Sequence, residues 1–188
     1  MVILKPFTLD NAQIHHQWNN DPELNYYDSE RPHELESYKD FVNRIKKVID
    51  ARNKRAELFE IHLKDPQKLI GIADIHDIDR HNNKCWIDCT IGDREYRHDP
   101  YLEIDALHKT LQYCFTFLKM HKVCTYAFDF NRTWIDNVEE VGFKQEGQLR
   151  SHILKDNEYH SKFLFGLLRN EYAEARDLWN ERISEMTS

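Results

Sequence analysis

Glycine is scarce in this sequence, with five residues among 188. Residues 91–107 read as the end of a strand, a short loop and the start of a helix, and they contain no glycine after Gly92. A junction of this kind commonly binds phosphate through backbone N–H groups, and glycine lets the backbone approach the phosphate closely. The lack of glycine therefore argues against a glycine-rich phosphate loop at this junction.

Long apolar runs, paired cysteines and an excess of basic residues are lacking too. No segment approaches the roughly 18 apolar residues of a membrane span, and the first residues do not resemble a secretory leader, so we expect a cytoplasmic protein without membrane contacts. The net charge of −7 argues against a nucleic-acid partner. The four cysteines lack CxxC spacing, which favours neither zinc nor disulfides and predicts buried, reduced thiols.

The length and composition fit one globular domain, because 188 residues of which 40% are hydrophobic can bury a continuous core. Patterning predicts strands over residues 2–7, 58–63, 69–75, 84–91, 122–130, 148–154 and 159–168. It predicts helices around residues 12–18 and over residues 35–55, 103–121, 134–140 and 171–186. The polar segment 19–34 contains two prolines and is predicted to be a loop.

The order of these elements resembles the Gcn5-related N-acetyltransferase (GNAT) superfamily, in the branch similar to ribosomal-protein alanine and spermidine acetyltransferases. The segments that carry the likeness are KPFTLDNA, WNNDPEL, LIGIADIHDID, TIGDREYR and VGFKQEGQLRSHILKDNEYHSKFLFGLLRNEY. The resemblance covers residues 2–172, which implies a single domain over residues 1–172 and a helical tail over residues 173–188. It implies an α/β (α+β) fold with a mixed, mostly antiparallel sheet of six to seven strands, flanked by helices and splayed between the fourth and fifth strands.

The resemblance also implies acetyl-CoA as cofactor. In the family, the splay admits the pantetheine arm, and a loop of the form Arg-Gly-x-Gly-x-Gly/Ala binds the pyrophosphate at the start of the long helix. Here Arg97 matches the first position, but Pro100 offers no N–H, and Asp99 and Glu103 add negative charge. The cofactor contacts implied are Thr90, Ile91, Arg97, His98, Asp99, Tyr101 and Asn131. The alternative is that Asp99 or Glu103 simply caps the helix.

The catalytic groups that many relatives use are replaced. The position of the family's tyrosine acid holds Val138, and that of its strand-four glutamate holds Trp86. Asp88 lies on the same strand face as Trp86 and is a candidate base. Tyr126 is a candidate acid and Asn131 a candidate positioning group. A salt-bridged aspartate and a packed tyrosine are the structural alternatives.

Residues of the predicted loop 19–34 are expected at the acceptor site. In relatives this loop covers the acceptor pocket, so Tyr26, Tyr27 and Asp28, together with Trp86, are the substrate-binding candidates. Packing of the tyrosines within the loop is the alternative. The turn with His76, Asp77, Asp79 and His81 has no recognised zinc spacing, so we expect no metal site.

Two classes of function follow. The first is an N-acetyltransferase that moves an acetyl group from acetyl-CoA to a primary amine: a small amine, an amino sugar or a protein N-terminus. The alternative is a catalytically inactive pseudoenzyme that serves as a binding or regulatory module, because the glycine loop, the tyrosine and the glutamate are all replaced. An enzyme that uses a different acyl donor is a third reading. Relatives of this branch often pair, so a homodimer is expected.

Overall fold

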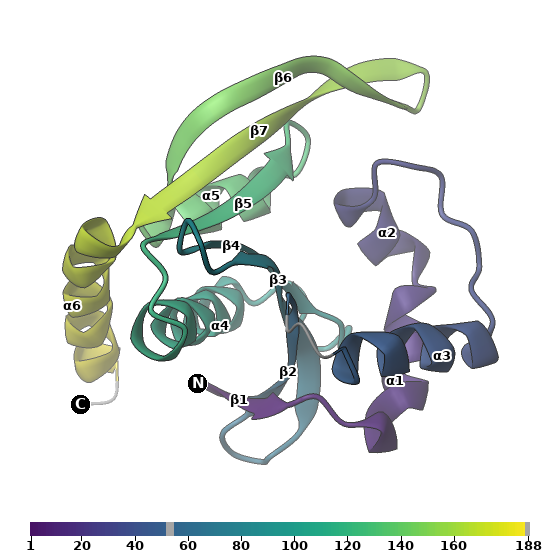
Figure 1. Ribbon diagram of the computed structural model, residues 1–188, viewed down its shortest axis with the longest axis horizontal. Helices are drawn as coiled ribbons and strands as arrows, with labels where there is room; N and C mark the ends of the chain where they lie inside the picture. Colours follow the sequence, from purple (N-terminus) through teal and green to yellow (C-terminus); the bar gives the residue numbers. More distant parts are fainter. Residues whose placement is uncertain (52–54, 187–188) are drawn as a thin grey trace.

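A computed structural model describes residues 1–51 and 55–186. The strands form one seven-stranded sheet in the order β1-β2-β3-β4-β5-β7-β6 (Figure 1). Their bounds are β1 Val2–Pro6, β2 Glu57–Leu63, β3 Leu69–Asp79, β4 Lys84–Ile91, β5 Lys122–Phe128, β6 Lys144–Lys155 and β7 Glu158–Leu168. Among the neighbouring strands of this sheet, only β4 and β5 run parallel, and a parallel pair requires a long crossover connection. The predicted mixed, mostly antiparallel sheet is confirmed.

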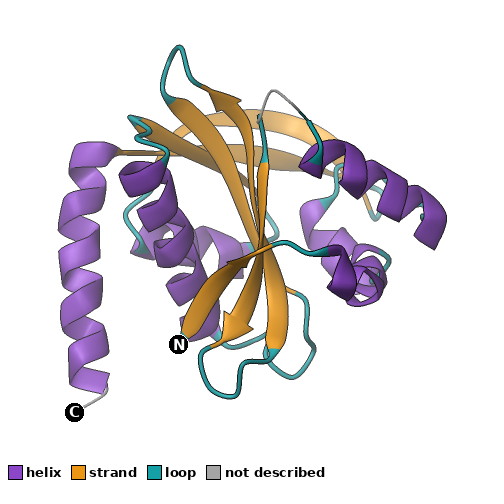
Figure 2. Ribbon diagram, turned by 60° about the horizontal axis from the view of Figure 1, so that its bottom comes forward, coloured by secondary structure: helices purple, strands orange, loops and turns teal. Residues whose placement is uncertain are grey.

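Helices cover both faces of the first four strands. Figure 2 shows α1, α2 and α3 on one face and α4 and α6 on the other. Their bounds are α1 Ala12–Asn19, α2 Pro22–Asp28, α3 Tyr38–Ile49, α4 Pro100–Gln112, α5 Arg132–Glu140 and α6 Arg169–Met186, with a 3₁₀ turn at Leu9–Asn11 and a π-helical turn at Tyr113–Phe117. α4 is the crossover between β4 and β5 and packs against β1, β3 and β4.

The alternation of β4 divides its side chains between the two faces of the sheet. Cys85, Ile87, Cys89 and Ile91 are buried in the main hydrophobic core, which also contains the apolar side of α4. The residues between them, Trp86, Asp88 and Thr90, are less buried and lie on the opposite face. A smaller core of Phe7, Ala12, Phe41 and Ile45 supports α1 and α3. β4 therefore presents different chemistry on its two faces.

The predicted loop 19–34 is wrong in part, because it contains helix α2. Asp21 caps this helix by accepting a hydrogen bond from the Glu23 backbone N–H at 2.9 Å, and Pro22 occupies the first turn, where its missing N–H costs nothing. The helix predicted over 35–55 is shorter, since Ser37 caps α3 and the helix ends at Ile49; residues 52–54 lie outside the described residues. The long helix begins at Pro100 rather than 103.

The C-terminal helix α6 packs on the main core. Tyr172 and Trp179 are both buried, and the Trp179 ring stacks on His108 of α4 with a centroid separation of 4.8 Å. Gly142, which follows α5, has φ of +98°, as expected for a glycine that ends a helix. No helix in the described part of the chain is long and apolar enough to cross a bilayer.

Candidate active site

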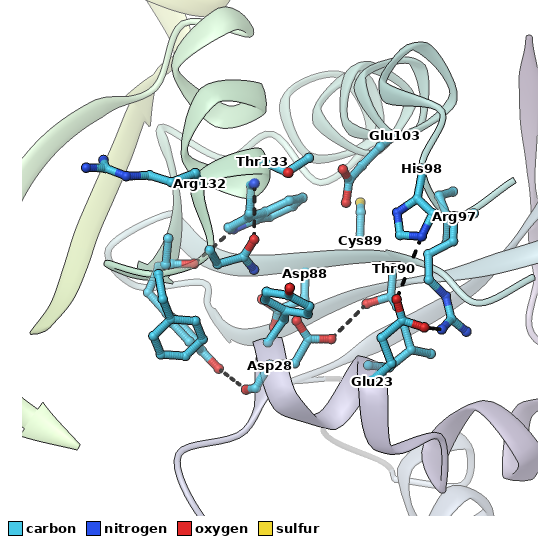
Figure 3. A pocket seen from close by; sticks show the side chains of 18 residues that line it. Glu23, Asp28, Asp88, Cys89, Thr90, Arg97, His98, Glu103, Arg132 and Thr133 are labelled. Atoms are coloured by element: carbon cyan, nitrogen blue, oxygen red, sulfur yellow. Dashed lines mark hydrogen bonds and ion pairs between the residues drawn. The ribbon is translucent and has the colours of Figure 1, made fainter. Parts of the chain in front are cut away.

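The sheet opens between β4 and β5. Lys84–Trp86 pairs with Lys122–Cys124, and beyond these residues the two strands are no longer paired. The gap leads into a cleft of about 400 Å³ lined by β4, β5, the start of α4, the start of α5 and the end of α2 (Figure 3). This is the splay that the sequence predicted, and it leaves backbone groups at the facing strand edges free for a ligand.

A second cavity of about 430 Å³ lies on the other side of β4, beneath α1, α2 and α3. Leu24, Asp28 and Thr90 line both cavities. Asp28 and Thr90 also contact each other, with the Thr90 hydroxyl 3.4 Å from the Asp28 carboxylate. The two compartments thus adjoin each other at these residues.

Asp99, the residue before Pro100, caps the start of α4 with its side chain. Asp99 Oδ1 accepts hydrogen bonds from the backbone N–H groups of Tyr101 at 3.0 Å and Leu102 at 3.4 Å. Pro100 contributes no N–H. The N–H groups that would meet a pyrophosphate are therefore already partly satisfied, and Asp99 makes the cap. Tyr101 is exposed, and neither Asp99 nor Tyr101 lines the cleft.

Arg97 lines the cleft, but its guanidinium is held by protein groups. It donates to Asp21 at 3.0 Å, to Glu23 at 2.5 Å and to the Gly92 carbonyl at 2.7 Å. Burial raises the pKa of Asp21, but the hydrogen bonds from Arg97 and the Glu23 backbone outweigh it, so the net pKa is lowered. Arg97 thus joins the loop between β4 and α4 to α2. His98, which also lines the cleft, lies 3.7 Å from Glu23.

Three aspartates gather around the junction of the two compartments. Asp88 of β4 accepts a hydrogen bond from His76 Nε2 at 3.1 Å, and this bond raises the pKa of His76 to about 9. Burial raises the pKa of Asp74 to about 6, and its Oδ1 has no hydrogen-bond partner among the described residues. Crowding by the cleft walls and the charge of Asp88 raise the pKa of Asp28 to about 7, although solvent in the cleft still reaches this side chain.

Tyr126 and Asn131 form the opposite wall. The Tyr126 hydroxyl donates to the Asp28 backbone carbonyl at 3.4 Å, and burial raises its pKa above the usual range. Asn131 caps α5 by accepting from the Trp134 backbone N–H at 3.3 Å. The Trp134 indole in turn donates to the Tyr126 carbonyl at 2.9 Å. These bonds fix the end of β5 against the start of α5.

The tip of the β6–β7 hairpin is tied to the end of α2. The Tyr26 hydroxyl donates to Asp156 at 2.8 Å. The Lys155 ammonium donates to the Tyr26 carbonyl and lies 4.5 Å from the Tyr26 ring centroid. Lys162 of β7 binds Glu30 at 2.6 Å and lies 3.6 Å from the Tyr126 ring centroid. We call these contacts the hairpin tie; it joins the β6–β7 hairpin to the end of α2 and the residues that follow it.

Of the residues predicted for the site, the structure brings nine to the cleft: Tyr27, Asp28, Asp88, Thr90, Ile91, Arg97, His98, Tyr126 and Asn131. Four do not line it: Tyr26, Trp86, Asp99 and Tyr101. Tyr26 belongs to the hairpin tie, and Trp86 lies where β4 and β5 are still paired. Val138 is fully buried in the core.

Sequence reasoning missed three residues that the site uses, Asp74, His76 and Glu103. His76 was assigned to a polar turn, but β3 continues to Asp79, and its register with β4 places His76 beside Trp86 on the sheet face that also carries Asp88. The two-residue spacing of Asp74 and His76 could have indicated this longer strand. Glu103 was read as a cap or as charge near phosphate; instead its side chain turns into the cleft above Cys89 (Figure 3).

A cleft between splayed parallel strands, followed by a long crossover helix, defines an acyltransferase fold of the GNAT type. The sequence model of the acetyltransferase (GNAT) domain family matches residues 1–144, and the chain belongs to this family. Members of the family use acetyl-CoA as acyl donor.

Curated relatives are also N-acetyltransferases by name. The chain is 24% identical to the uncharacterized N-acetyltransferase p20 of Bacillus licheniformis, over 90% of this chain and 94% of that protein. It is 25% identical to the prophage-derived uncharacterized N-acetyltransferase YokL of Bacillus subtilis, over 70% of this chain and 73% of that protein.

Among solved structures, the chain is similar to the spermidine N-acetyltransferase of Vibrio cholerae in complex with CoA and spermine. The TM-score is 0.82 and the identity 21%, over 92% of this chain and 98% of that one. At this identity the likeness shows the fold.

Proposed function

We propose that the protein is an acetyl-CoA-dependent N-acetyltransferase that acts on a primary amine. The observation that carries this proposal is that a donor cleft and an acid-lined cavity share Asp28 and Thr90 as lining residues. We infer from it a passage at β4 between the two compartments. Direct transfer needs an amine and a thioester to meet in such a passage, and holding them together supplies much of the rate acceleration.

The donor compartment fits an acyl-pantetheine arm better than it fits a pyrophosphate. Its walls expose the unpaired edges of β4 and β5, whose backbone groups suit an amide-bearing arm. At its outer end, His98 lines the cleft and Arg97 is already paired with Asp21 and Glu23, while Asp99 occupies N–H groups of the first turn of α4. In this proposal, Thr90, Ile91 and Asn131 hold the arm, and its phosphates lie at the outer end of the cleft near His98.

The acceptor compartment suits a cationic amine. Asp28 and Asp74 line this cavity and Asp88 lies beside it, so their carboxyl groups would attract an ammonium group, although Arg44 and His76 offset part of their charge. Trp18 and Phe41 give this cavity an aromatic surface, which also favours cations. The Vibrio cholerae relative in complex with CoA and spermine gives an example of a polycationic amine bound in this fold.

Asp88 and Asp28 have different roles in this proposal. Asp88, already paired with His76, orients the ammonium group. Asp28 takes the proton, because a base with a pKa of about 7 is half ionised at neutral pH and still basic enough to accept it. The Tyr126 hydroxyl fixes the Asp28 backbone and so the position of this base.

Amine-dependent release of the CoA thiol tests the proposal. Purified protein is incubated with acetyl-CoA and a panel of polyamines, monoamines, amino sugars and N-terminal peptides, and the free thiol is measured. Turnover that saturates with one amine class and falls at least tenfold in Asp28→Asn supports the assignment. No turnover with any amine, together with no calorimetric binding of CoA, would refute it.

The second candidate function is a pseudoenzyme that binds a ligand without turning it over. The capped start of α4 favours this candidate, because Asp99 satisfies amides that a pyrophosphate would otherwise use. Binding of CoA or an amine without detectable thiol release would support it. Any amine-dependent turnover above the background rate would exclude it.

A further inference from the structure

A carboxyl group and a buried amide occupy the donor side of the cleft, in the region where the family's tyrosine acid is absent. Glu103 lies in the first turn of α4, and its side chain lines the donor cleft. Its Oε2 accepts a hydrogen bond of 2.5 Å from Nδ2 of Asn137 on α5. Asn137 is 4% exposed and directly precedes Val138, so the pair bridges the two helices that border the cleft.

We propose that Glu103 is the general acid of the transfer reaction, positioned by Asn137, and that it protonates the departing thiolate. This inference rests on the proposed function. It assigns the acid to a helix different from the one that carries the tyrosine in many relatives, and it accounts for an active cleft in which Val138 has no proton to give.

The proposed acid, Glu103, and the proposed base, Asp28, lie on opposite sides of β4. Asp88 projects to the side of the acceptor cavity, whereas Cys89, the next residue, projects to the side of α4, beneath Glu103 (Figure 3). Glu103 and Asp28 therefore reach the passage from different elements and different directions. In a direct transfer, the amine enters beside one carboxyl group and the thiol leaves beside the other.

The surroundings of Glu103 favour its protonated form. Burial, and to a smaller extent the charge of Asp28, raise the pKa of Glu103 to about 7, while the Asn137 hydrogen bond acts in the opposite direction. On β4, the Cys89 thiol bonds to Thr110 and is neutral, because burial raises its pKa to about 12. The other walls carry further ionisable groups, which are Glu23 and Asp28 of α2, Asp88 of β4, Arg97 and His98 of the loop, Tyr126 of β5 and Arg132 of α5.

Each proton that moves in the proposed transfer has a donor and an acceptor. The ammonium group first loses one proton to solvent, which leaves a neutral amine with a free electron pair. The amine nitrogen then forms a bond to the thioester carbonyl carbon and gives its second proton to Asp28. The carbon–sulfur bond then breaks, and its electron pair stays on sulfur, which takes the proton of Glu103. Asp28 and Glu103 exchange the proton through solvent, which restores both groups. The products are the N-acetyl amine and the free thiol.

The test is the pH dependence of turnover in Glu103→Gln. Wild type is expected to give a bell-shaped profile of kcat, with an acidic limb from Asp28 and a basic limb from Glu103. Glu103→Gln should lower kcat by about 10²-fold and abolish the basic limb, with little change in the KM for acetyl-CoA. Glu139→Gln is the matched control, because Glu139 is exposed on α5 outside the cleft, and it should behave as wild type.

Asn137→Ala gives an independent readout. Loss of the amide donor removes the interaction that lowers the Glu103 pKa, so the basic limb should move to higher pH while kcat on the plateau falls less than in Glu103→Gln. A residue that only supported the fold would change stability without moving this limb.

Different results would refute the acid role of Glu103 and the transferase function. If wild type turns over but Glu103→Gln keeps both kcat and the basic limb, the acid role is wrong and the transferase function stands. If Glu103→Gln binds CoA more tightly with kcat unchanged, Glu103 only repels the donor's phosphates, and the acid role is again wrong. An inactive wild type would remove both proposals.

Discussion

Arg97 is expected to contribute more to stability than any exposed cation near it. Its guanidinium is 7% exposed and donates to Asp21, which is 8% exposed, and to Glu23, which is 44% exposed. Arg97→Ala leaves Asp21 buried without its main partner, which typically costs about 3–5 kcal/mol. The half-exposed Glu23 adds less than about 1 kcal/mol. At about 2–4 °C per kcal/mol for a chain of this size, Tm should fall by about 6–20 °C.

Urea unfolding and thermal scans of three variants test this estimate. Arg94→Ala is the matched control, since Arg94 also contacts Asp21, at 3.4 Å, but is 78% exposed and should cost less than about 1 kcal/mol. Asp21→Asn in the Arg97→Ala background should recover part of the loss, because it removes the uncompensated charge. The reasoning is refuted if Arg97→Ala and Arg94→Ala destabilise the protein equally.

Three further predictions concern His108, Trp179 and Asp28. Burial lowers the pKa of His108 to about 4, so stability should be complete above pH 6.5 and fall by roughly 3 kcal/mol by pH 4; urea unfolding of His108→Phe should lack this component. Trp179→Ala should cost about 3–5 kcal/mol in the same assay, and a loss under 1 kcal/mol would show that α6 is not docked in solution. Asp28→Asn should remove the acidic limb of the kcat profile, while CoA binding measured by calorimetry should remain. An unchanged acidic limb would assign it to another group.

The sheet was predictable because its strands carry strong local patterns. β4 alternates over its whole length, and its bounds of Lys84–Ile91 agree with the prediction. Helix α2 was missed because seven mostly polar residues have little amphipathic pattern of their own. This helix is fixed by the Asp21 cap and by contacts with Arg97, which is 76 residues away in sequence. Such contacts leave no local signal.

The site was predictable only where a residue lies on a recognised element. Asp88 and Tyr126 follow from the alternation of their strands, and the structure places both at the cleft. The partnership of His76 with Asp88 depends on the register between β3 and β4, which sequence alone does not determine. Glu103 and Asp99 were interchangeable as caps in the sequence; the structure shows that Asp99 caps and that Glu103 faces the cleft.

The hairpin tie has a consequence for how the cleft responds to its medium. Its recorded contacts are ion pairs, hydrogen bonds and lysine–aromatic contacts, such as Lys162 with Glu30 and Lys155 with Tyr26. Dissolved salt screens exposed charges over a length that shrinks from about 8 Å at physiological strength to about 3 Å at 1 M, but it does not weaken apolar packing. Rising ionic strength should thus loosen the contact between the hairpin and the cleft-lining helix α2 while the main core stays intact, and exchange of amide hydrogens in the hairpin would report it.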